Sequence, residues 1–247
     1  MRARLPAAVL VFALAATASA AAKIEKRTLV SREKERTYYL YVPPGITAEH
    51  PAPLILTFHG SGRDGKPLVA EWQRRADKEG IVLAGPDSTD SVHWGSPQDG
   101  PLLLHDLVEE IAAKYPIDRR RVYLFGHSAG AVFTLQMACL ESEYFAAAAA
   151  HAGSVDPAYH SIFDVAARKI PIAIFIGTKD AFFPLTSVRA TAEALKSRGF
   201  PVTLTEMPGH THDYYSKSGE INAQVWDLFS RTRLETDPKY QVYADPK

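Results

Sequence analysis

The chain has 247 residues with 28 basic and 28 acidic side chains, so its formal net charge is zero, and 46% of its residues are hydrophobic. The charges are mixed along the chain without a basic tract or an acidic tail, which argues against a nucleic-acid-binding protein. The single cysteine, Cys139, cannot form a disulfide framework, so the fold must be stabilised by a hydrophobic core.

The N-terminus has the pattern of an export signal. Arg2 and Arg4 precede an apolar stretch that ends at the small residues Ala18-Ser19-Ala20. The apolar stretch is shorter than the about 20 residues of a membrane-spanning helix. We therefore expect residues 1–21 to be a signal peptide that is removed and residues 22–247 to form a single domain. The mature protein is then secreted or periplasmic, without stable membrane association.

Beyond the signal, strand patterns and helix patterns alternate along the chain. Short apolar or alternating runs predict strands, and longer stretches with apolar residues at helical spacing predict helices. Such alternation with short connections indicates an α/β fold with a mostly parallel sheet and helices on both faces. The expected elements are strands 36–43, 53–60, 81–87, 122–125, 145–153, 169–180 and 201–207, and helices 67–80, 101–116, 128–140, 186–199 and 219–233.

Ser128 lies between a predicted strand and a predicted helix, in the sequence Gly126-His127-Ser128-Ala129-Gly130. A tight turn at this junction needs small neighbours, because the strand and the helix approach each other closely. Glycines placed in this way expose a serine at the start of the helix, as in a nucleophile elbow. The alternative is a serine N-cap flanked by glycines by chance.

Other reactive side chains follow later strands. Asp180 comes just after the strand in 169–180, and His210 and His212 follow the strand 201–207. Ligands of such sheets bind at the carboxyl ends of the strands. The order serine, aspartate, histidine is that of the α/β-hydrolase triad. An aspartate in this position that only caps a helix, and a solvated loop histidine, are the structural alternatives.

The chemistry of a serine nucleophile explains this combination of residues. A serine hydroxyl needs a histidine to take its proton, and a carboxylate orients that histidine. The oxyanion of the transition state needs hydrogen-bond donors. We expect one donor to be the Ala129 N–H, directly after the nucleophile, and the other to be the Ser61 N–H in the sequence His59-Gly60-Ser61.

Several motifs, in this order, resemble one family of enzymes. They are FHGSG, WQRRADKEGIVLAGPD, YPIDRRRVYLFGHSAGAVFTLQMAC, FAAAAAHAG, GTKDAFFP and PGHTHDYY, between about residues 26 and 232. Together they resemble α/β-hydrolase-fold secreted esterases of the polyhydroxybutyrate depolymerase and feruloyl esterase type. The resemblance implies Ser128 as nucleophile, Asp180 as acid and a C-terminal histidine as base. The sequence HGSG replaces the cysteine-containing oxyanion loop common in the depolymerases.

The histidine that acts as base is ambiguous. The feruloyl esterase and depolymerase patterns place it directly after a glycine, which favours His210. A pattern similar to formylglutathione hydrolases selects His212, before the sequence DYY. The spacing H-x-H-x-D also occurs at zinc sites, but no further histidine lies close by in the sequence. We expect no metal and no cofactor.

The surroundings of these residues suggest the type of substrate. The connection 154–169 is short, so no lid domain is expected over the cleft. We expect Trp94, His127 and Phe182 to contact the substrate. The sequence therefore predicts a serine carboxylesterase for small or oligomeric esters, feruloyl-like or hydroxyalkanoate-like, and leaves the oligomeric state undefined.

Two other function classes remain open. A serine peptidase of the prolyl-oligopeptidase type shares the triad and the fold but usually carries an additional domain. A noncatalytic binding protein of α/β-hydrolase type would lack a triad residue, and none is missing from this sequence.

Overall fold

The computed structural model describes residues 22–243, so the expected signal peptide lies outside the described range. None of the helices in that range is both long enough and apolar enough to cross a membrane.

The described chain builds one eight-stranded sheet in the order β1-β2-β4-β3-β5-β6-β7-β8. Strands β3 to β8 pair in parallel, whereas β1 and β2 pair antiparallel at one edge. The prediction of a mostly parallel sheet is confirmed, although the edge strand β1 was not predicted. The strands are β1 (Glu25–Ser31), β2 (Lys34–Tyr41), β3 (Ala52–Phe58), β4 (Val82–Pro86), β5 (Ile117–His127), β6 (Ala147–His151), β7 (Ile172–Gly177) and β8 (Val202–Met207).

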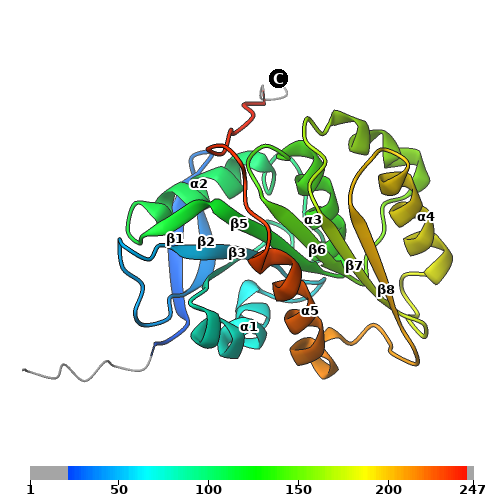
Figure 1. Cartoon of the computed structure of the whole chain (residues 1–247), viewed down its shortest axis with the longest axis horizontal. Helices are drawn as coiled ribbons and strands as arrows, with labels where there is room; N and C mark the ends of the chain where they lie inside the picture. The colour runs from blue at the N-terminus through cyan, green and yellow to red at the C-terminus, as the bar shows by residue number, and fades with distance from the viewer. Residues whose placement is uncertain (1–21, 244–247) are drawn as a thin grey trace, which may run out of the picture.

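Helices cover both faces of the sheet (Figure 1). Helices α1 and α5 pack together on one face, and α2, α3 and α4 cover the other. Each face has its own hydrophobic core, since side chains of successive strand residues point to opposite sides. The helices are α1 (Gly65–Glu79), α2 (Pro101–Ala112), α3 (Ala129–Leu140), α4 (Leu185–Lys196) and α5 (Ser218–Ser230), with short 3-10 helices η1 (Pro157–Val165) and η2 (Tyr214–Ser216).

The central strands are buried on both faces. Every residue of β3 is buried, which explains its continuous apolar sequence. Strand β6 consists of four alanines and His151, all of them buried. Helix α3 packs on β6 from one side and α5 from the other. Small side chains allow both helices to come close to the sheet at this strand.

The parallel strands end along one edge, and the candidate residues follow them there. Ser128 follows β5, Asp180 follows β7, and both His210 and His212 follow β8. The fold therefore brings together side chains that are far apart in the sequence.

Candidate active site

Ser128 occupies a strained turn between β5 and α3. Its φ angle is +57°, in a region that non-glycine residues rarely adopt. A Cβ at Gly126 would lie 2.1 Å from the Gly130 oxygen, and a Cβ at Gly130 would lie 2.0 Å from the Phe58 oxygen. Only glycine fits at these two positions, which explains the Gly-x-Ser-x-Gly pattern. The turn holds the Ser128 side chain at the end of the sheet.

His212 lies between Ser128 and Asp180. Its Nε2 is 2.9 Å from Ser128 Oγ, and its Nδ1 is 2.8 Å from Asp180 Oδ2. The Asp180 side chain is 1% exposed, and its Oδ1 accepts hydrogen bonds from the backbone N–H groups of Phe182 and Phe183. With Nδ1–H donating to Asp180, Nε2 is left to accept the Ser128 hydroxyl proton. The arrangement has the geometry of a nucleophile, a base and an orienting acid.

The preference for His210 as the partner of Ser128 was wrong, because the structure places His212 next to Ser128 Oγ. The Nε2 of His210 lies 3.2 Å from Nε2 of His151 instead. The backbone of this loop is fixed against the end of β7, because the Lys179 N–H donates to the His210 oxygen and a Cβ at Gly177 would lie 2.2 Å from that oxygen. This places the His210 ring over the end of β6, and the ring of His212, two residues later, reaches Ser128.

Two further histidines lie beneath the site at neighbouring strand ends. His127 and His151 are paired in the β5–β6 register, and their Nδ1 atoms are 3.0 Å apart. Burial lowers the pKa of His127 to about 4 and that of His151 to about 2, so both rings are neutral at neutral pH. Burial also lowers the pKa of His210. His151 was not predicted to be a site residue, although its position at the end of a parallel strand is one where site residues are expected.

Aromatic and imidazole rings surround His212. The His127 ring centroid is 4.9 Å away, that of Phe182 is 4.7 Å away, and that of Phe183 is 5.9 Å away in a stacked orientation. These contacts, together with the bond to Asp180, restrict the orientation of the His212 ring.

The loop after β3 approaches Ser128. A Cβ at Gly60 would lie 3.1 Å from the Ser128 Cβ. Neither the Ser61 N–H nor the Ala129 N–H, the two expected oxyanion donors, has a hydrogen-bond partner within residues 22–243. Unpaired backbone donors next to a nucleophile are available to a developing oxyanion.

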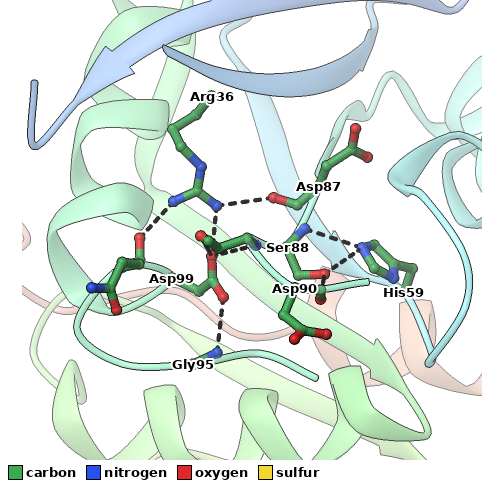
Figure 2. Close-up of polar contacts among 9 residues, drawn as sticks. Arg36, His59, Asp87, Ser88, Asp90, Gly95 and Asp99 are labelled. Carbon is green, nitrogen blue, oxygen red and sulfur yellow. Dashed lines mark hydrogen bonds and ion pairs between the residues drawn. The ribbon is translucent and has the colours of Figure 1, made fainter. Parts of the chain in front are cut away.

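A second loop, residues 87–100, supports the loop after β3. The His59 Nε2 accepts from the Ser88 N–H, the Trp94 Nε1–H donates to the His59 oxygen at 3.0 Å, and the Gly62 N–H donates to the Ser91 oxygen at 2.6 Å. Figure 2 shows the Ser88–His59 contact beside the polar network of the second loop.

A buried ion pair organises the supporting loop (Figure 2). Arg36 of β2 lies 2.6 Å from Asp99, whose side chain is fully buried. Asp99 also accepts from the Thr89 N–H and hydroxyl and from the Gly95 N–H. Arg36 donates further to the Asp87 oxygen. The loop that carries Trp94 is thereby tied to the sheet.

A cleft of about 430 Å³ opens beside Ser128. His127 and Phe182 line it, as expected, but Trp94 does not. The Trp94 ring instead stacks on Phe133 with centroids 4.9 Å apart, and its Nε1–H bond to His59 supports the loop after β3. The full lining is Gly60, Ser61, Arg63, His127, Ser128, Phe182, His212, Asp213 and Tyr215.

Two lining residues were not identified as site residues from the sequence. The Arg63 guanidinium lies 5.0 Å from the centroid of the Tyr215 ring, and the two side chains form one wall of the cleft. Tyr215 belongs to the DYY sequence that follows His212. That sequence was the only indication that Tyr215 lies near the site. Within the described range, no group of three or more histidine, cysteine, aspartate or glutamate residues is arranged to hold a metal ion.

Comparisons with known proteins find relatives that are named as an esterase and a depolymerase. Feruloyl esterase B of Neurospora crassa is 29% identical over 182 residues, which cover 68% of this chain and 60% of that protein. Poly(3-hydroxyalkanoate) depolymerase C of Paucimonas lemoignei is 30% identical over 128 residues, which cover 47% of this chain and 30% of that protein. The chain thus spans 30% to 60% of the length of these curated relatives.

A solved structure shows the same fold. An S-formylglutathione hydrolase from Agrobacterium tumefaciens matches with a TM-score of 0.68 at 22% identity, covering 84% of this chain and 94% of that one. The model of the dienelactone hydrolase family matches residues 98–231, more than half of the 247-residue chain. The predicted resemblance to α/β-hydrolase esterases is confirmed, and the chain belongs to the dienelactone hydrolase family.

Proposed function

We propose that the protein is a serine carboxylesterase in which Ser128 is the nucleophile, His212 the general base and Asp180 the acid that orients the base. The observation that carries the proposal is the continuous contact from Asp180 Oδ2 through His212 to Ser128 Oγ, at 2.8 Å and 2.9 Å. Membership of a hydrolase family and the esterase relatives support the same reaction class.

In the proposed mechanism, Ser128 Oγ attacks the ester carbonyl carbon while its proton moves to His212 Nε2. The Ser61 and Ala129 N–H groups stabilise the oxyanion, and removal of one oxyanion-hole donor typically costs roughly 3–4 kcal/mol in serine hydrolysis. The ester C–O bond then breaks, and the leaving alcohol takes the proton from His212. A water molecule, deprotonated by His212, hydrolyses the acyl-enzyme and regenerates the Ser128 hydroxyl.

The cleft supports small or oligomeric esters as substrates, feruloyl-like or hydroxyalkanoate-like. Its walls combine the exposed ring of Phe182 with the Arg63–Tyr215 pair, so it offers both apolar and polar contacts. Two relatives are named as a feruloyl esterase and a poly(3-hydroxyalkanoate) depolymerase. We also propose export to the periplasm or the medium, on the basis of the N-terminal pattern.

Labelling with a fluorophosphonate probe tests the proposal. We expect an adduct on Ser128 by mass spectrometry, no adduct in Ser128→Ala, a strongly reduced rate of labelling in His212→Gln, and retained labelling in the matched variant His210→Gln. Aryl esters should be hydrolysed and aminoacyl-arylamides should not. A folded protein that is not labelled would overturn the enzyme proposal, and hydrolysis of the arylamides alone would indicate a peptidase.

A further inference from the structure

The ring of His59 lies between two backbone groups and bonds to both. Its Nδ1 is 2.9 Å from the carbonyl oxygen of Gly60, the next residue, and its Nε2 is 3.2 Å from the backbone nitrogen of Ser88. The ring is buried and does not line the cleft. The proposed mechanism assigns no proton transfer to it, so its fixed position calls for another explanation.

The two partners determine where the ring carries its hydrogen. A carbonyl oxygen can only accept a hydrogen bond, so Nδ1 carries a hydrogen and donates to Gly60. A backbone N–H can only donate, so Nε2 presents a lone pair to Ser88. The Ser88 hydroxyl also lies 3.3 Å from Nε2, but it donates to the Asp90 oxygen at 2.6 Å. The ring is therefore neutral, and burial, which lowers the pKa of His59, favours the same state.

The bond from Nδ1 sets the direction of a peptide next to Ser128. The Gly60 oxygen belongs to the peptide that carries the Ser61 N–H, one of the two expected oxyanion donors. This peptide is trans, and in a planar trans peptide the C=O and the N–H point in opposite directions. The oxygen points to the buried ring. The N–H therefore points away from the ring, toward the cleft that Gly60 and Ser61 line beside Ser128.

Other contacts fix the chain on both sides of this peptide but not the peptide itself. On one side, the Trp94 Nε1–H donates to the His59 oxygen at 3.0 Å. On the other side, the Gly62 N–H donates to the Ser91 oxygen at 2.6 Å. Among the described residues, the intervening peptide has no hydrogen bond besides the one from the His59 ring. Rotation of this peptide about the axis between its two Cα atoms would leave the flanking bonds intact, so the ring is what limits that rotation.

We propose that His59 is a positioning residue, which holds the Ser61 N–H in the direction of the oxyanion through its Nδ1–H bond to the Gly60 oxygen. The inference rests on the proposed esterase function and deepens it. A hydrogen bond weakens steeply as its angle departs from linearity, so a rotated peptide donates poorly. The oxyanion exists only in the transition state and the intermediates. Loss of the bond should therefore lower kcat and leave KM nearly unchanged.

Two amide variants separate the two bonds of the ring. In His59→Asn the side-chain NH2 takes the place of Nδ1 and can donate to the Gly60 oxygen, but it does not reach Ser88. In His59→Gln the longer amide takes the place of Nε2 and can accept from the Ser88 N–H, but nothing donates to the Gly60 oxygen. Since removal of an oxyanion donor costs about 10²- to 10³-fold, we expect kcat on an aryl ester to fall by about 10- to 10³-fold in His59→Gln. KM should stay within about threefold, and His59→Asn should retain about ten times the kcat of His59→Gln or more.

Ser88→Ala is the matched control. It removes the hydroxyl near the ring but keeps the N–H that donates to Nε2, so kcat should stay within about threefold of wild type. Urea unfolding shows that each variant is folded under the assay conditions. A role in stability alone would change the unfolding midpoint and leave kcat of the folded enzyme unchanged. Equal kcat in His59→Asn and His59→Gln, or a loss confined to KM, would overturn the inference.

Two measurements on the wild-type protein decide the question if the variants do not fold. Ring 15N spectra should show the His59 hydrogen on Nδ1, and the Ser61 amide proton should move downfield when a fluorophosphonate adduct forms on Ser128. A hydrogen on Nε2, or an unchanged Ser61 signal in the adduct, would overturn the inference alone. A folded protein that forms no adduct would overturn the proposed function instead.

Discussion

Replacing Asp180 with asparagine tests the orientation of the proposed base. Asp180 Oδ1 accepts two backbone N–H groups, and Oδ2 accepts the His212 Nδ1–H. In Asp180→Asn the amide oxygen should remain with the two N–H groups, so the amide nitrogen faces His212 and donates to Nδ1. The hydrogen of His212 then lies on Nε2, which can no longer accept the proton of Ser128.

The size of the loss follows from the cost of the opposite orientation. Turning the amide oxygen toward His212 leaves two backbone N–H groups without an acceptor, at about 1–3 kcal/mol each. The active orientation is therefore disfavoured by about 2–6 kcal/mol, and each 1.4 kcal/mol is a factor of about ten. We expect kcat on an aryl ester to fall by about 30-fold to about 10⁴-fold, with little change in the free energy of unfolding.

Asp213→Asn is the matched control for this experiment. Asp213 also lines the cleft, but its Oδ1 accepts from the Tyr215 N–H and not from His212. Its kcat should remain within a fewfold of wild type. An Asp180→Asn enzyme with kcat within threefold of wild type would refute the tautomer argument, and so would an equal loss in Asp213→Asn.

Three further predictions concern stability and are measured by urea unfolding. Asp99→Ala leaves Arg36 buried without its partner, so it should lower the free energy of unfolding by about 3–5 kcal/mol. Adding Arg36→Met should recover part of this loss, because the unpaired charge is removed. Additive effects of the two substitutions would show that Asp99 and Arg36 are not energetically coupled. Burial raises the pKa of Glu141 to about 7, so between about pH 4.5 and 7 the folded state binds more protons than the unfolded state and stability falls as pH rises. Glu141→Gln should therefore be more stable than wild type by about 2–3 kcal/mol at pH 8 and equal to it at pH 4, and an equal stability at pH 8 would contradict this prediction. Gly130→Ala should lower the free energy of unfolding by about 1–3 kcal/mol or more, because the added Cβ would lie 2.0 Å from a backbone oxygen of β3. Gly219→Ala meets open space within α5 and should be neutral or stabilising by up to about 1 kcal/mol. Equal effects of the two substitutions would contradict the steric account.

The architecture was largely readable from local patterns. Buried parallel strands have continuous apolar sequences, and the tight turn at Ser128 requires glycine on both sides, so these features are encoded in neighbouring residues. The edge strand β1 was missed. It pairs only with β2 and has mostly exposed or half-exposed charged residues in its first half, and its identity as a strand depends on that pairing.

The choice between His210 and His212 depended on contacts that the local sequence does not encode. Both residues follow β8 on one loop, and the direction of each ring is set by the ends of two other strands. Gly177 of β7 fixes the backbone at position 210, and His151 of β6 provides a partner for the ring. Trp94 was misplaced for the same reason, since its ring packs against Phe133 of a distant helix.

The alanine strand beneath the nucleophile has a consequence for how this protein varies. By composition, residues 147–150 are the least distinctive part of the chain. Yet helices pack against both faces of this strand. A larger side chain at any of the four positions therefore has to displace α3 or α5. Displacing α3 moves the turn that holds Ser128. Tolerance to mutation is therefore expected to be lowest where the sequence is simplest, and libraries that aim to change the substrate range should leave this strand untouched and vary the exposed cleft wall.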